Sequence, residues 1–107
     1  MRYSPRMEIV MTAAFAEKIE EQLGERDWAV IERIAMHPEA GKVIKGAGGL
    51  RKIRVALPGR GKRGGARVIY FWRREKLLLF LDIYAKNERE DLSAGELAGL
   101  VKQIEGL

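Results

Sequence analysis

The chain has 107 residues, of which 47% are hydrophobic and 33% charged, with a formal net charge of +5. This length fits one domain with one core, which we expect over residues 7–107 after an N-terminal extension at residues 1–6. The chain contains no cysteine, which excludes disulfides and thiolate metal sites. No stretch approaches the roughly 18 apolar residues of a membrane span, and Glu8 interrupts the only signal-like segment. We therefore expect a soluble, cytoplasmic protein without a membrane partner.

The first half of the chain predicts a short strand and two helices. Residues 7–11 form the expected strand, and Thr12 is a suitable N-cap for a helix that ends at Gly24. Asp27 can cap a second helix, which Pro38 stops. The short link predicts that the two helices lie antiparallel. Their apolar faces are formed by Phe15, Ile19 and Leu23 in the first helix and by Trp28, Ile31, Ile34 and Ala35 in the second.

The second half predicts strands and a final helix. Residues 38–50 are expected to form a loop, and strands follow over 51–57, 66–73 and 77–84. The last strand is apolar at nearly every position, as in a strand covered on both faces. Short connections predict an antiparallel meander. The final helix begins with a capping box formed by Ser93 and Glu96. Its apolar face is formed by Leu97, Leu100, Val101 and Ile104.

The resulting order is β-α-α-β-β-β-α. This order is typical of a small α+β domain with an antiparallel core sheet and helices packed on it.

Positive charge is concentrated in residues 51–76, which hold ten Lys and Arg residues against one acid, Glu75. A solvated face is the simpler interpretation, but charge placed on and between strands favours a polyanionic partner. Residues 59–64, GRGKRG, match the dinucleotide-binding fingerprint literally. The match is rejected because the loop leads into a strand, whereas a pyrophosphate site needs a helix N-terminus. Three aromatic residues near the loop could stack on bases, namely Tyr70, Trp72 and Tyr84, although the mid-strand position of Trp72 favours a core role.

Acid–base and metal chemistry are restricted by the available side chains. His37 is the only histidine, so a pair of histidines cannot cleave RNA, and its place before Pro38 favours a turn role. The acids Asp82, Glu88, Glu90 and Asp91 have no metal-ligand spacing, and a solvated turn is their default role. Hydrolytic chemistry in this chain would therefore be free of metal and cofactor and would depend on Arg, Lys and Tyr.

Three segments carry a family resemblance: GGLRKIR, KRGGARVIYFW and YAKNEREDL. Together they resemble the RelE/HigB superfamily of bacterial type II toxins, and most of all its HigB-like branch. The resemblance extends from about Met7 over nearly the whole chain. It implies a ribosome-dependent mRNA endonuclease that uses the ribose 2′-hydroxyl to attack the adjacent phosphate.

The resemblance also implies site residues. Arg67 matches the arginine that contacts the scissile phosphate, and the cationic side chains of the family's second strand match Lys52 and Arg54. Asn87 and Ser93 stand where RelE itself has an arginine and a tyrosine, so Tyr84 and Lys86 are expected to substitute in acid–base chemistry. The predicted catalytic set is Lys52, Arg54, Arg67, Tyr84 and Lys86, and the predicted RNA-binding set is Arg51, Arg60, Lys62, Arg63 and Arg73.

The implied partners are the ribosome, mRNA and a cognate antitoxin with a helix-turn-helix domain, through which the complex would bind operator DNA. Two other interpretations stay open. One is a basic RNA- or ribosome-binding protein without catalysis, and the other is a phage-derived homologue whose toxicity has decayed.

Overall fold

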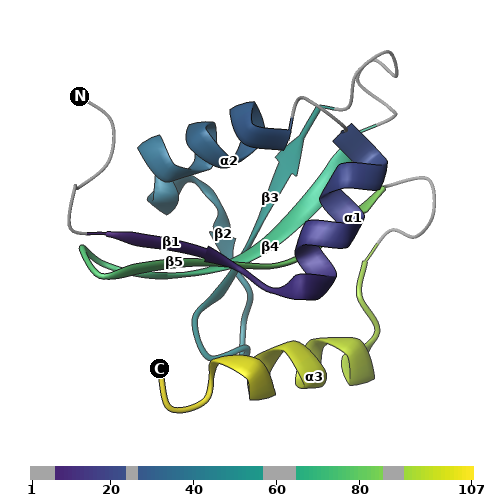
Figure 1. The fold of residues 1–107 in the computed structure, drawn as a ribbon. Coiled ribbons are helices and arrows are strands. Elements are labelled where there is room, and N and C mark those ends of the chain that lie inside the picture. Colours follow the sequence, from purple (N-terminus) through teal and green to yellow (C-terminus); the bar gives the residue numbers. More distant parts are fainter. Residues whose placement is uncertain (1–6, 24–26, 57–64, 86–90) are drawn as a thin grey trace.

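The computed structural model describes residues 7–23, 27–56, 65–85 and 91–107, which form a sheet with helices on both faces (Figure 1). The helices of the described residues are α1 (Ala13–Leu23), α2 (Asp27–Met36), the 3₁₀ turn η2 (Pro38–Ala40) and α3 (Ala94–Ile104). The strands are β1 (Glu8–Met11), β2 (Lys42–Val43), β3 (Leu50–Val55), β4 (Ala66–Arg73) and β5 (Leu77–Ala85).

The sheet has the strand order β1-β5-β4-β3-β2. Strands β3, β4 and β5 form the predicted antiparallel meander, and β2 pairs antiparallel with β3. Strand β1 pairs in parallel with β5, so the sheet is mixed. Strand β5 therefore lies between two strands, and all its residues after Leu77 are buried. This confirms the central position that its continuous apolar pattern predicted.

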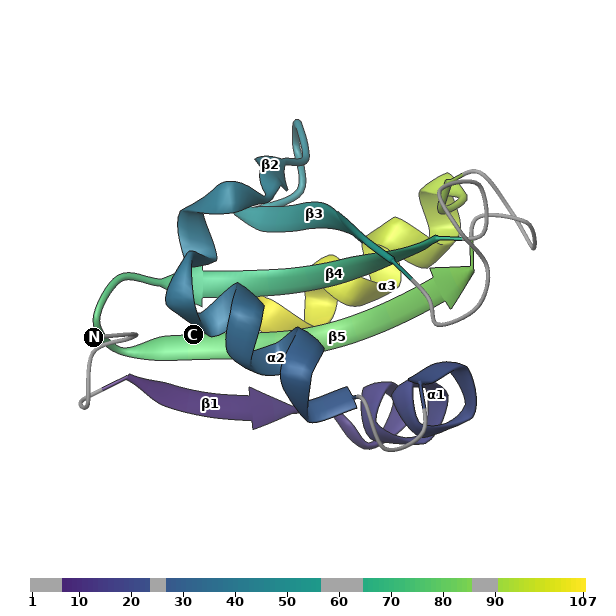
Figure 2. The ribbon, with the colours of Figure 1, turned by 90° about the horizontal axis from the view of Figure 1, so that it is seen from above.

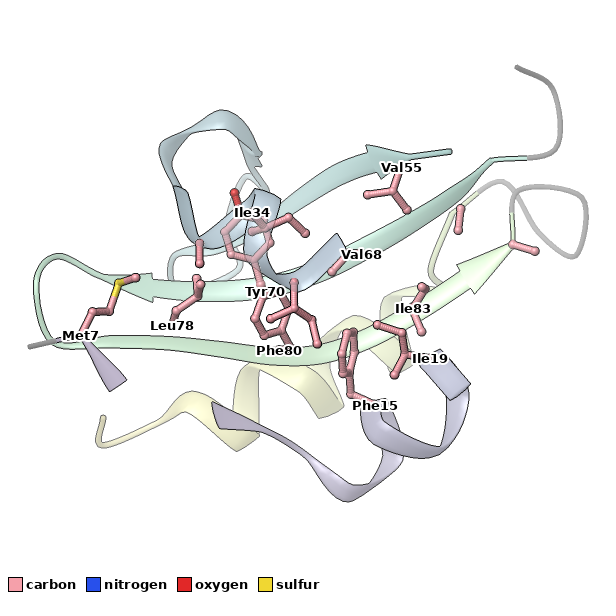
Figure 3. Close-up of a cluster of buried hydrophobic side chains, with 14 residues drawn as sticks. Met7, Phe15, Ile19, Ile34, Val55, Val68, Tyr70, Leu78, Phe80 and Ile83 are labelled. Atoms are coloured by element: carbon pink, nitrogen blue, oxygen red, sulfur yellow. The ribbon is translucent and has the colours of Figure 1, made fainter. Parts of the chain in front are cut away.

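Each face of the sheet has its own apolar cluster. Helices α1 and α2 cover one face and α3 covers the other (Figures 1 and 2). Under α1 and α2, Phe80 is fully buried between Phe15 and Tyr70, with ring centroids 5.2 and 6.2 Å away (Figure 3). Under α3, Leu100 and Ile104 pack in the second cluster. Alternation along each strand divides its side chains between these two faces.

Two of the predicted helix caps, Thr12 and Ser93, are confirmed, whereas Asp27, also predicted as a cap, is the first residue of α2. The Thr12 hydroxyl accepts from the Phe15 backbone N–H at 3.1 Å, and it also donates to Leu81. At α3, the Ser93 hydroxyl accepts from the Glu96 backbone N–H and the Glu96 carboxylate accepts from the Ser93 backbone N–H, which together form a capping box. The helix end predicted at Gly24 lies outside the described residues.

Three expectations about local structure are wrong. Residues 38–50 contain η2 and β2, because two residues are too few to show a strand pattern in sequence. Trp28 is 55% exposed, because a side chain in the first turn leans towards the helix N-terminus, where no preceding turn lies. Helices α1 and α2 cross at a wide angle instead of lying antiparallel, since each packs on the sheet (Figures 1 and 2).

The turn η2 is fastened to the sheet by Tyr70 and Arg51. The buried Tyr70 hydroxyl donates to the Pro38 carbonyl at 2.7 Å and accepts from the Gly41 N–H at 2.9 Å. A Cβ at Gly41 would lie 2.5 Å from that hydroxyl, so glycine permits the close approach. Burial raises the pKa of Tyr70 above its ordinary value, which keeps the hydroxyl protonated and able to donate.

Candidate functional site

Three predicted catalytic residues lie in one row across the sheet. Arg54 on β3 is directly opposite Arg67 on β4, and Arg67 is directly opposite Tyr84 on β5. Directly opposed residues on neighbouring strands have Cβ atoms about 4.5–5.5 Å apart and point to the same face. Tyr84 packs in the α3-side cluster, so the row faces the α3 side of the sheet.

Lys52 lies on the same face of β3 as Arg54, two residues earlier, as the alternation predicted. Lys42 on β2 is in register with Lys52. Four cationic side chains therefore meet at one cleft of about 380 Å³, whose described lining consists of Ala40, Lys42, Lys52, Ile53, Arg54 and Arg67. A concave surface lined by four cations is suited to phosphate groups.

Arg67 has an unsatisfied donor in this cleft. Its Nε atom is buried and has no hydrogen-bond partner in the part of the chain that the structure describes. Buried donors are rarely left without a partner, because the cost of desolvation is then uncompensated. Gly65 sets the start of β4 close against β3, since a Cβ there would lie 2.8 Å from the Val55 carbonyl oxygen. The guanidinium is thus held on a fixed strand at the cleft, and its Nε keeps hydrogen-bonding capacity that no described residue uses.

A carboxylate links two of the predicted site residues. Asp91 lies 3.2 Å from the Lys52 ammonium through Oδ2, and its Oδ1 accepts from the Tyr84 hydroxyl at 3.3 Å. The Leu92 N–H, at 2.9 Å, is the main cause that lowers the pKa of Asp91, and Lys52 and Tyr84 add to it against partial burial. Asp91 is therefore ionised at neutral pH.

Arg51 and Arg73, both predicted to bind RNA, do not line the cleft. Arg51 points to the opposite face of β3, donates to the carbonyls of Glu39 and Gly41, and lies 5.3 Å from the centre of the Trp72 ring. Arg73 lies at the far end of β4 and donates to the Leu107 carbonyl. The contacts of both residues hold backbone segments in place.

The expectation of base stacking is wrong for two of the three aromatic residues. Tyr70 is fully buried and Tyr84 is 2% exposed, because both lie on inner strands under a helical layer. Trp72 is half-buried and has Arg51 over its ring. The Tyr84 hydroxyl, rather than its ring face, is what reaches the site.

The remaining predicted site residues lie outside the described part of the chain. They are the predicted catalytic Lys86, with its neighbour Asn87, and the loop cations Arg60, Lys62 and Arg63.

A family model described as the RelE toxin of the RelE / RelB toxin-antitoxin system matches residues 7–105. The chain belongs to the RelE toxin family. As a member it is a toxin of a toxin–antitoxin system, and the family implies an antitoxin partner. The α+β fold with its antiparallel core is the one that the resemblance implied.

Two residues of the candidate site are not predicted by the sequence. Lys42 was placed in a loop, and only its pairing with β3 brings it to the cleft. The sequence indicates a solvated turn for Asp91, although Asp91 follows Tyr84 by seven residues and lies two residues before Ser93, the N-cap of α3. The capping box could have indicated that the helix start holds Asp91 near the end of β5.

Residues 7–23, 27–56, 65–85 and 91–107 include no α-helix with the length and apolar character of a bilayer span. They also contain no group of three or more His, Cys, Asp or Glu side chains placed to hold a metal ion.

Proposed function

We propose that this RelE-family toxin cleaves mRNA on the ribosome by attack of a ribose 2′-hydroxyl on the adjacent phosphate. The 2′ oxygen forms a bond to phosphorus, the bond from phosphorus to the 5′ oxygen breaks, and a 2′,3′-cyclic phosphate is left. One proton leaves the 2′-hydroxyl and one is delivered to the departing 5′ oxygen. The observation that carries the proposal is the row of Arg54, Arg67 and Tyr84 beside a cationic cleft.

Arg67 is the proposed centre of transition-state stabilisation. The phosphorane that forms during attack carries more negative charge than the starting phosphodiester, and fixed guanidinium donors stabilise that increment. The unpartnered Nε of Arg67 supports this role, because phosphate would satisfy it. Arg54, directly opposite, adds a second guanidinium, and Lys52 and Lys42 add point charges along the cleft.

Proton transfer is assigned to Tyr84 and Lys86. The position of Tyr84 directly opposite Arg67 supports this assignment. The Tyr84 hydroxyl also donates to Asp91, which in turn contacts the cleft residue Lys52. Lys86 is assigned by its match to the family motif. The loop residues Arg60, Lys62 and Arg63 are proposed to bind the RNA backbone.

The proposed partners follow the HigB-like resemblance. They are a helix-turn-helix antitoxin that blocks the cationic cleft, the ribosome with its mRNA, and operator DNA through the antitoxin complex.

The test measures cleavage of a defined mRNA on translating ribosomes. We expect products that end in 2′,3′-cyclic phosphate, and no cleavage where the scissile nucleotide is 2′-deoxy. Arg67→Ala is expected to reduce the single-turnover rate about 10²–10³-fold, the usual cost of removing one such donor. Arg33→Ala removes an exposed arginine from the last turn of α2 and serves as the charge-matched control.

Two outcomes would contradict the proposal. A near-parental cleavage rate for Arg67→Ala would remove Arg67 from the chemistry. Ribosome binding without any cleaved product would instead support the non-catalytic RNA-binding function.

A further inference from the structure

The carboxylate of Asp91 occupies a position that the proposed chemistry does not explain. Its two oxygens contact the Lys52 ammonium and the Tyr84 hydroxyl, at 3.2 and 3.3 Å. A site that must stabilise growing negative charge on phosphate is weakened by a permanent anion at its edge. Asp91 therefore needs a role that is compatible with the arrival of a second anion.

Asp91 is poorly suited to accept a proton in the reaction. Hydrogen bonds from Leu92, Lys52 and Tyr84 lower its pKa, and a weak base gives little assistance near neutral pH. A role as general base for Tyr84 is thus disfavoured.

The same contacts suit displacement by phosphate. Carboxylate and phosphate oxygens accept hydrogen bonds from the same ammonium and hydroxyl donors. The Asp91 side chain is 62% exposed whereas that of Lys52 is 24% exposed, so the anion lies on the solvent side of the pair. The pair also lies beside Arg54 and Arg67, whose cleft Lys52 lines.

We infer that Asp91 is an internal stand-in for a substrate phosphate: it holds Lys52 in the RNA-free protein and releases it when an RNA phosphate enters the cleft. Phosphate binding must then break the pair between Lys52 and Asp91, so Asp91 lowers the affinity of the cleft for phosphate. The inference rests on the proposed function only in naming RNA as the ligand whose phosphate enters the cleft.

The first experiment uses inorganic pyrophosphate as the probe and measures its dissociation constant by calorimetry. Asp91→Asn keeps an oxygen that can accept from Leu92 and Tyr84 but loses the charge that holds Lys52. We expect it to bind pyrophosphate more tightly than the parental protein, by up to about fivefold, which is the upper value for a partly exposed ion pair. Glu105→Gln removes an exposed charge from the C-terminal end of α3 and should bind like the parental protein.

A double-mutant cycle separates release of Lys52 from simple repulsion. Repulsion between Asp91 and the probe would persist in a Lys52→Gln background, so Asp91→Asn would still improve binding there. Release of Lys52 predicts that the improvement disappears in that background. Persistence of the full gain, or a gain no larger than that of Glu105→Gln, would overturn the inference.

A second measurement needs no added anion. Acetylation of Lys52 by acetic anhydride, followed by mass spectrometry, should be severalfold faster in Asp91→Asn than in Glu105→Gln. Equal rates would overturn the inference.

Repeating the cycle with an RNA oligonucleotide whose scissile nucleotide is 2′-deoxy, and so cannot be cleaved, tests RNA as the ligand. The pyrophosphate and mRNA cleavage measurements together separate the two proposals. A retained pyrophosphate effect without mRNA cleavage by the parental protein would reject the proposed function and leave the role of Asp91 standing.

Discussion

Arg51 and Arg54 lie three residues apart on β3, and their side chains leave the strand on opposite faces. Arg51 points to the α2 side, where its guanidinium donates to two backbone carbonyls and covers Trp72. Arg54 points to the other side, where it lines the cleft with Lys42, Lys52 and Arg67. One face is thus closed by apolar packing and backbone hydrogen bonds, and the other keeps its cations available at a cleft. Charge along the sequence is therefore a poor guide to function until the face of each residue is known.

The largest expected effect is the loss of stability when the apolar packing on the α1 and α2 side of the sheet is disrupted. Phe80→Ala removes a fully buried ring that packs against Phe15 and Tyr70. We expect the free energy of unfolding to fall by about 3–5 kcal/mol, because transfer and cavity costs add. Urea denaturation monitored by tryptophan fluorescence measures the loss. A loss below about 1 kcal/mol would show that the ring is not part of a close-packed core.

The comparison is sharpened most directly by matched substitutions of the two arginines. Arg54→Ala should reduce mRNA cleavage about 10–100-fold, the value of a hydrogen bond to a charged group, with little change in the unfolding midpoint. Arg51→Ala should do the reverse, lowering stability by about 1 kcal/mol while the folded protein keeps its cleavage rate. Each variant is measured for both properties. The assignment of faces fails if both variants lose activity to the same extent.

A smaller effect is expected from Tyr70→Phe. This change removes the hydroxyl that joins Pro38 and Gly41 to the sheet but keeps the buried ring. The free energy of unfolding should fall by about 1–2 kcal/mol, because buried backbone groups lose their partner. An unchanged urea midpoint would mean that water replaces the hydroxyl without cost.

The smallest effect is a pH dependence at Asp91. Its pKa in the folded protein lies below its ordinary value of 3.8, so it contributes stability above that value. The contribution is lost as the pH falls through the lowered pKa. The parental protein should therefore be slightly more stable than Asp91→Asn at pH 7, and the difference should disappear at low pH. Thermal unfolding of both proteins between pH 2 and 7, a range set around ordinary carboxyl pKa values, measures this difference; a difference that grows on acidification would contradict it.

Local patterns predicted much of the fold. The period of two placed Lys52 and Arg54 on one face, and the continuous apolar run from Leu77 identified the central strand. Thr12 and Ser93 identified helix starts because their side chains bond to backbone groups within the same turn. These features depend on neighbours three or four residues away, so the sequence around them is sufficient.

The wrong predictions involve partners that are distant in the chain. Strand β2 exists because Lys42 and Val43 pair with β3. Tyr70 was considered for base stacking, yet its hydroxyl bonds to residues about thirty positions earlier. No local pattern contains these contacts.

The residue types and their alternation by themselves determined a small α+β domain with concentrated positive charge, and its motifs indicated the RelE family that the comparison then showed. Only the tertiary structure decided which cations share a cleft, because pairing of β2, β3 and β4 brings Lys42, Lys52, Arg54 and Arg67 together. It also separated Arg51 from them and placed the Asp91 carboxylate on Lys52. The physical reason is that alternation fixes the face of a side chain, whereas strand register and the packing of α3 on the sheet fix its neighbours.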